Sequence, residues 1–251
     1  MQGVSVRAIE TGAPHRVRAA HGGDDTRIHH ARWLVDASGR AGLLRRQLGI
    51  EEDNGHHIGA AWMRIDARLH LDHWCDNAAW RGLCQPQERW RSTNHLCGPG
   101  YWVWLIPLAS GAHSIGIVAD STMHPVETFN SFERALAWLQ VHQPALAREL
   151  GTRRDALLDF GFLRNVSYGC RQVFSAERWA LTGEAAMFLD PFYSPGSDFI
   201  AIGNGSLTAL VARDFAGRMD ASAVRPFQHL FFSFPRPPLA LSRGPSALFG
   251  P

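Results

Sequence analysis

The chain has 251 residues, of which 45% are hydrophobic and 19% are charged, a composition that can fill a globular core. Its formal charge of +2 comes from arginines spread singly or in pairs, which argues against nucleic acid or a membrane as a partner. No run approaches the ~18 consecutive apolar residues of a membrane span, and no signal-peptide pattern opens the chain, so we expect a cytoplasmic protein. The four cysteines form no C-x-x-C pair, and no metal site is expected.

The first part of the chain predicts a meander followed by a strand, a turn and a helix. Residues 3–35 alternate between apolar and polar positions in short runs separated by polar turns, a pattern typical of antiparallel strands. The run then ends in the turn Asp36-Ala37-Ser38-Gly39-Arg40. Residues 43–48 have helical spacing and stop at Gly49, a residue that commonly ends helices.

Strand patterns dominate the middle of the chain. They cover residues 58–65, 101–108, 114–119 and 157–172, with glycine and proline turns between them. Between the last two, residues 126–150 carry apolar side chains at three- and four-residue spacing, which predicts one helix. A sheet with a covering helix is the expected result.

The last part again predicts a strand, a turn and a helix, as the first part does. Residues 178–182 predict a short buried strand, residues 183–197 a loop punctuated by glycine and proline, and residues 199–215 an amphipathic helix. Ser197 or Asp198 is positioned to cap this helix. After about residue 225 the chain becomes rich in proline and phenylalanine.

The loop over residues 183–197 has three features that suit a cofactor carrying phosphates. Glu184 follows a buried strand and can hold a ribose hydroxyl, and small residues such as Gly196 let the backbone approach a ligand. The following helix offers unpaired N–H groups and a positive potential at its start. The alternative is an ordinary loop capped by Ser197.

These residues resemble a known family of FAD-binding proteins, which contains para-hydroxybenzoate hydroxylase-like monooxygenases and flavin-dependent halogenases. Gly183-Glu184 and Asp190-Pro191 match the family segment that contacts the ribose and pyrophosphate side of FAD, although the family usually has Asp where Glu184 stands. Ser194-Pro195-Gly196 resembles the segment that passes the flavin ring.

Two further motifs carry the resemblance. The turn with Asp36, Gly39 and Arg40 is similar to the family's second fingerprint near the FAD phosphates, although such turns are also common without any ligand. The strand containing Trp102, Trp104 and Pro107 resembles the Trp-x-Trp-x-Ile-Pro signature of the halogenases, which lies near the flavin. On one strand face two such tryptophans form an aromatic wall, and core packing is the alternative interpretation.

The resemblance implies an α/β fold of the two-domain FAD-dependent monooxygenase type, in a truncated form. Residues 1–49 and 178–220 would make a partial FAD-binding domain, interrupted by residues 50–177 as a substrate domain with a mainly antiparallel sheet. Residues 221–251 would begin a C-terminal segment.

The implied function is that of a flavoprotein oxidoreductase with FAD as cofactor. Electrons would come from NAD(P)H or a flavin reductase, and O₂ would react through a flavin hydroperoxide to halogenate or hydroxylate a small, electron-rich substrate such as an aromatic compound. Halide would be a further partner in the halogenase case.

Two family features are missing from the sequence. The halogenases that the chain resembles carry an N-terminal Gly-x-Gly-x-x-Gly turn and a lysine that relays hypohalous acid to the substrate. This sequence has no such turn near residue 1 and no lysine, all 25 basic residues being arginine, so no catalytic residue is assigned. The alternatives are therefore a monooxygenase or dehydrogenase without halogenation, and a catalytically incompetent flavoprotein fragment.

Overall fold

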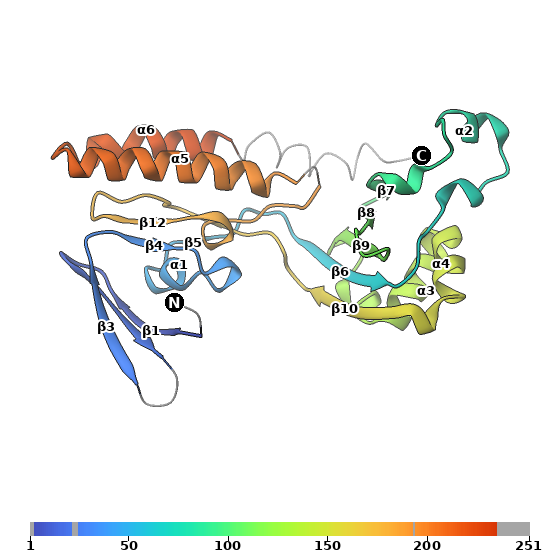
Figure 1. The fold of residues 1–251 in the computed structure, drawn as a ribbon, viewed down its shortest axis with the longest axis horizontal. Helices are drawn as coiled ribbons and strands as arrows, with labels where there is room; N and C mark the ends of the chain where they lie inside the picture. The colour runs from blue at the N-terminus through green and yellow to red at the C-terminus, as the bar shows by residue number, and fades with distance from the viewer. Residues whose placement is uncertain (1–2, 22–24, 193, 235–251) are drawn as a thin grey trace. The chain divides into compact units, whose positions relative to one another are not determined.

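The computed structural model describes residues 3–21, 25–192 and 194–234. Its contacts divide the chain into two compact units (Figure 1). Of the described residues, those up to 55 and those from 167 to 234 form the first unit, and residues 56–166 form the second. The chain thus leaves the first unit and later returns to it, crossing at 55–56 and 166–167 where the sequence suggested 49–50 and 177–178.

The first unit opens with a three-stranded antiparallel sheet. Its strands are β1 (Ser5–Glu10), β2 (His15–Ala20) and β3 (Thr26–Ala31), in the order β1-β2-β3. Most side chains of β3 are exposed or partly exposed, whereas β2 buries its two ends. This is the meander that the alternating pattern predicts, with one face solvated.

Two smaller sheets lie at the centre of the first unit. The short strands β4 (Leu34–Asp36) and β12 (Trp179–Leu181) pair in parallel, with Asp36 opposite Leu181. The strands β5 (Glu51–Glu52) and β11 (Gly169–Cys170) pair antiparallel. Because all of β12 is buried, the parallel pair anchors the core of this unit, together with side chains from the helices α1 (Leu43–Gln47), α5 (Gly196–Phe215) and α6 (Ala221–Ser233).

Helices complete the first unit. They are η1 (Gly39–Ala41), α1 (Leu43–Gln47), η6 (Gly183–Ala185), α5 (Gly196–Phe215) and α6 (Ala221–Ser233). α5 begins at Gly196, three residues before the expected start, and Pro195 stands at its N-cap with no side-chain hydrogen bond. The expectation that Ser197 or Asp198 caps the helix is wrong, because both already lie inside its first turn.

The second unit is built on a five-stranded antiparallel sheet in the order β10-β6-β9-β8-β7. The strands are β6 (Ile58–Ile65), β7 (Asn94–Gly98), β8 (Tyr101–Pro107), β9 (His113–Asp120) and β10 (Leu157–Leu163). β10 stops nine residues before the predicted end at residue 172. One face of the sheet carries the side chains of a buried core, including Met63, Val103 and Ile117.

The helical segments described in the second unit are η2 (Leu71–His73), α2 (Ala78–Gly82), η3 (Arg89–Arg91), η4 (Val126–Thr128), α3 (Phe132–His142), α4 (Pro144–Gly151) and η5 (Arg154–Ala156). Buried side chains of η2, η4, α3 and α4 pack into that core. The single helix expected over 126–150 is wrong. Pro144 has no backbone N–H and disfavours helical geometry at Gln143, which lies at φ −143°, so α3 ends and α4 begins there.

In the described part of the chain, no helix combines the length and apolar character needed to cross a membrane. The same residues contain no group of three histidine, cysteine or acidic side chains placed to bind a metal ion. Residues 235–251, most of the expected C-terminal segment, lie outside the described residues, and α6 occupies its beginning.

Candidate functional site

The carboxyl ends of β4 and β12 lie side by side in the first unit, because the two strands run in parallel. The backbone N–H of Thr182, just after β12, donates to the carbonyl of Asp36 at 3.0 Å. The turn η1 after β4 contacts η6 after β12. The structure therefore brings together the two segments that the sequence singled out separately, at the edge of a parallel pair where α/β proteins bind ligands.

Asp36 shapes the first of these turns. Its carboxylate is buried, and it accepts hydrogen bonds from the backbone N–H of Ser38 at 2.8 Å and of Leu44 at 2.7 Å. Gly39 has a φ of +61°, a conformation that glycine adopts without strain. Both carboxylate oxygens of Asp36 thus serve the fold, and Asp36 positions the turn and the start of α1.

The second turn lines a cleft of about 220 Å³ between η6 and the start of α5. Its walls include five of the predicted cofactor residues, Gly183, Glu184, Asp190, Pro195 and Gly196. This volume is below the ~300–1,000 Å³ typical of a complete small-molecule site. The cleft is therefore suited to one part of a dinucleotide.

Glu184 presents its carboxylate to solvent at this cleft. The side chain is exposed, and none of the described residues forms a hydrogen bond or ion pair with its carboxylate. Its backbone carbonyl accepts a hydrogen bond from the Tyr168 hydroxyl at 2.8 Å, which fixes the main chain. Glu184 is thus held in place while its acceptor oxygens remain available.

Asp190 and Pro191 organise the far side of the loop. The buried carboxylate of Asp190 accepts from the N–H of Phe192 at 2.7 Å. The carbonyl of Pro191 accepts from the N–H of Ser194 at 2.9 Å. Ser194 has a φ of +53°, a conformation that costs a non-glycine residue about 1–2 kcal/mol. The loop residue Tyr193 lies outside the described residues.

The start of α5 closes the cleft. A helix leaves its first N–H groups without intrahelical partners, and no side chain caps this one. A Cβ built on Gly196 meets no atom within 4 Å, so open space lies above this backbone. The first turn also contains the carboxylate of Asp198, which reduces the positive potential there.

Sequence reasoning missed Arg45 and Tyr168. Arg45 is buried, donates from Nη1 to the carbonyl of Ala186 at 3.2 Å, and stacks 4.2 Å from the centre of the Tyr168 ring. It has no carboxylate partner within the described residues, and its Nε has no acceptor. Arg40 stacks on Tyr168 as well, at 5.0 Å. Nothing in the sequence distinguishes buried Arg45 from exposed Arg46.

Arg45 therefore supplies an uncompensated positive charge behind the loop that lines the cleft. A buried cation without a counter-charge is costly, and a phosphate group is a suitable partner for a guanidinium. The residues present at this site thus fit a ligand that carries phosphate and hydroxyl groups.

The tryptophans of the predicted aromatic wall lie in the second unit. Trp102 and Trp104 project from the same face of β8, with ring centres 5.8 Å apart. This face is opposite to the one that carries the core residue Val103. Trp102 is almost fully buried, whereas Trp104 is partly exposed and donates from Nε1 to the Ser114 hydroxyl at 3.1 Å.

Glycines on neighbouring strands allow the indole rings to lie flat against the sheet. Gly116 is the cross-strand partner of both Trp104 and Trp62, and a Cβ on Gly116 would overlap the Trp104 indole. Similarly, a Cβ on Gly161 would lie 2.6 Å from the Trp62 ring. Pro107 ends β8 opposite His113. All residues of this wall belong to the second unit.

Gly116→Ala is expected to lower the free energy of unfolding by about 1–3 kcal/mol, because the added methyl forces the Trp104 ring out of place. Urea unfolding followed by tryptophan fluorescence measures the change. Gly82→Ala is the matched control, since a Cβ there meets nothing within 4 Å. Equal stability of the two variants would show that Trp104 moves aside at no cost.

The comparisons with known proteins point to one family. No family model matches the chain. Over 206 residues, 75% of the chain, it is 31% identical to flavin-dependent halogenase chlA of Dictyostelium discoideum. Over 186 residues, 69% of the chain, it is 30% identical to tetracycline 7-halogenase of Kitasatospora aureofaciens. These similarities support the flavin-dependent halogenase family. The chain spans about a third of the length of these two relatives, 32% of each.

Solved structures agree with the expected fold. Halogenase PltM in complex with phloroglucinol and FAD superposes with a TM-score of 0.72 at 17% identity, over 91% of this chain and 46% of that one. A flavoprotein/dehydrogenase from Cytophaga hutchinsonii gives 0.71 at 20% identity, over 97% and 56%. The α/β fold, in which the chain leaves one unit and later returns to it, is thereby confirmed. FAD is the cofactor that flavin-dependent halogenases use.

Proposed function

We propose that this chain is part of a flavin-dependent halogenase, binds FAD at the cleft beside β4 and β12 and serves FAD-dependent halogenation. The observation that carries the proposal is the cleft itself. Three features lie together at this cleft: the unpaired carboxylate of Glu184, the uncapped start of α5 and the open space above Gly196. These are the groups that a ribose hydroxyl, a phosphate and a closely approaching ring require.

Each residue has a proposed task. Glu184 accepts a hydrogen bond from a cofactor hydroxyl, Arg45 balances phosphate charge, and Asp36 holds the turn that carries Gly39 and Arg40. FAD supplies the oxidising chemistry through its reaction with O₂, and the protein positions and shields it. That Trp102, Trp104 and Pro107 lie near the flavin stays a prediction of the family resemblance.

Halide is proposed to bind at backbone amides at the start of α5. The amide of Ser194 already donates to Pro191, and Pro195 has no N–H. Gly196 and Ser197 are therefore the donors left for an anion at this position, where the helix dipole also favours negative charge.

A small electron-rich substrate and a flavin reductase remain part of the proposal. The second candidate function is oxidation without halogenation, by a monooxygenase or dehydrogenase. It is favoured by the absence of lysine from the sequence, because the family resemblance assigns the relay of oxidised halide to a lysine. Mass spectrometry of a substrate panel, incubated with FAD, reductase, O₂ and bromide, separates the two functions by the mass added.

The proposal is tested by mixing the purified chain with FAD. Flavin absorbance should remain with the protein through desalting, and the unfolding temperature should rise with FAD concentration, because a ligand that binds only the folded state stabilises it. Absence of both effects would overturn the proposal for this chain.

Glu184→Ala is expected to weaken FAD binding about tenfold while leaving stability unchanged. A hydrogen bond to a carboxylate contributes about 1.5–3 kcal/mol, and exposure reduces that value. Fluorescence titration of FAD measures the affinity. Glu177→Ala is the matched control, because Glu177 is also exposed and does not line the cleft. Equal affinities for the two variants would exclude Glu184 from the site.

A further inference from the structure

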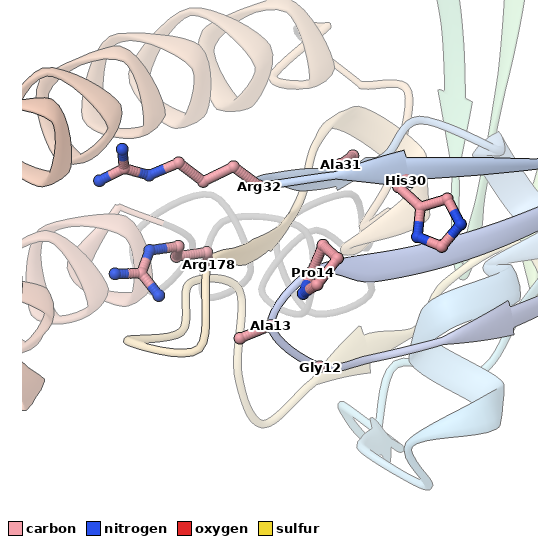
Figure 2. A pocket seen from close by; sticks show the side chains of 7 residues that line it. All are labelled: Gly12, Ala13, Pro14, His30, Ala31, Arg32 and Arg178. Atoms are coloured by element: carbon pink, nitrogen blue, oxygen red, sulfur yellow. The ribbon is translucent and has the colours of Figure 1, made fainter.

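The first unit has a second cleft, of about 310 Å³, at the opposite ends of the same strands. Arg32 lies two residues before β4 and Arg178 one residue before β12, and both line this cleft. Figure 2 shows the two arginine side chains extending in the same direction, with Pro14 beside them. Because β4 and β12 are parallel, this cleft is separate from the candidate cofactor cleft at their carboxyl ends.

Asp214 of α5 holds both arginines. Its buried carboxylate accepts from the Nε of Arg32 at 2.7 Å and from the Nε of Arg178 at 2.9 Å. The indole of Trp33 also donates to it, at 3.0 Å. The guanidinium of Arg32 stacks 4.7 Å from the ring centre of Phe215. These contacts fix the position of both guanidinium groups.

One carboxylate neutralises only one of these two cations. Within the described residues, Arg178 uses Nε alone, and Arg32 uses Nε and Nη2, the latter to the carbonyl of Asp214 at 2.9 Å. Three terminal nitrogens therefore have no protein acceptor, and both side chains are partly exposed, at 49% and 36%. The cluster has one positive charge in excess, together with donors suited to a carboxylate.

The backbone of Arg178 has an unusual conformation, which several hydrogen bonds hold. Its φ of 64° is unusual for a residue other than glycine. Its carbonyl accepts from the N–H of Leu34 at 3.0 Å and from Nε2 of His15 at 2.9 Å, and its N–H donates to Ser175 at 3.1 Å. A strained conformation held by several contacts is typical of residues with a function.

The remaining walls are mostly apolar. Gly12, Ala13 and Pro14 from the turn between β1 and β2 line one side, and His30 and Ala31 from the end of β3 line another. The volume falls within the ~300–1,000 Å³ of small-molecule sites. The cleft thus offers space for an apolar body next to the arginine donors.

We propose that this cleft binds a small organic carboxylate with an apolar body, the carboxylate pairing with Arg32 and Arg178. A monoanion matches the single excess charge, and Ala13, Pro14 and Ala31 offer apolar contacts to the body of the ligand. This site is independent of the proposed FAD cleft, so its failure would leave that proposal intact.

The probe for this proposal is benzoate, titrated into the full chain at low ionic strength and followed by amide chemical shifts. Saturable binding is expected, with neutral benzamide at least about tenfold weaker because it lacks the charge that the arginines recognise. Inorganic phosphate separates a general anion site from a carboxylate site. Phosphate binding as tightly as benzoate, or benzamide as tightly as benzoate, would overturn the proposal.

Two variants test the geometry. Ala31→Leu fills the cleft without altering the ion cluster and should weaken benzoate binding at least about tenfold, whereas Thr26→Leu on the same strand should not. Asp214→Asn removes the carboxylate that competes with the ligand for Arg32 and Arg178, so benzoate should bind severalfold more tightly. The same substitution lowers the stability of the fold, and a loss of stability cannot by itself produce tighter binding. Unchanged benzoate affinity in Ala31→Leu, or weaker affinity in folded Asp214→Asn, would contradict the assignment.

Discussion

Asp214→Ala is expected to lower the free energy of unfolding by about 2–4 kcal/mol at neutral pH. The substitution leaves Arg32, Arg178 and Trp33 without their shared acceptor in a partly buried cluster, and removal of one member of such a cluster is strongly destabilising. Urea unfolding followed by tryptophan fluorescence measures the loss, since Trp33 is itself a member of the cluster.

Asp25→Ala is the matched control in the same unit. Asp25 pairs with Arg27 at 2.9 Å, but both side chains are at least half exposed, and such surface pairs contribute about 0–1 kcal/mol. A loss of stability in Asp214→Ala no larger than that in Asp25→Ala would show that the cluster does not hold the first unit together.

The contribution of Asp214 also depends on pH. The hydrogen bond from Arg32, followed by those from Arg178 and Trp33, lowers the pKa of Asp214 to about 2 from 3.8, against the opposing effect of burial. Because the folded pKa lies below the unfolded one, the stabilisation is complete above about pH 5 and is lost as the pH falls toward 2. The stability difference between the native chain and Asp214→Ala should therefore shrink in acid.

Much of the fold could be predicted from local sequence pattern. Alternation and turn residues located the meander and four of the five strands of the second unit, but not β7. The Asp36 turn was placed at the end of its strand. The prediction of one continuous helix over 126–150 was wrong because apolar spacing takes no account of Pro144. Its ring disfavours helical geometry at the preceding residue and so interrupts the helix. The cap of α5 was wrong because Ser197 and Asp198 are both good capping residues, whereas the helix begins earlier at Gly196.

The candidate site was predictable where it is contiguous in sequence. The described residues that line the cleft all lie between positions 183 and 200, so the loop and helix start could be recognised together. Arg45 could not, because its burial depends on packing against Tyr168 and Ala186, more than 100 residues away. The same holds for Asp214, whose partners Arg32 and Trp33 lie 182 and 181 residues away in sequence.

Gly196→Val is expected to weaken FAD binding by about tenfold to a hundredfold. The structure shows open space above Gly196 and no positive φ there, so a larger side chain is compatible with the folded chain. The valine methyl groups would instead occupy the space that the cofactor needs to approach the backbone. The substitution is therefore expected to weaken FAD binding without disturbing the fold.

Gly205→Val provides the matched control. Gly205 lies in the same helix, is exposed, and has no atom within 4 Å of a built Cβ. The cost of a β-branched residue in a helix is therefore present in both variants, and only Gly196 lines the cleft.

The most direct test of the FAD site is the ratio of the FAD dissociation constants of these two variants, determined by fluorescence titration beside the unaltered chain. We predict that Gly205→Val binds FAD like the unaltered chain and that Gly196→Val binds at least about tenfold more weakly. Equal dissociation constants for the two variants, or no FAD binding by the unaltered chain, would contradict a flavin site at this cleft.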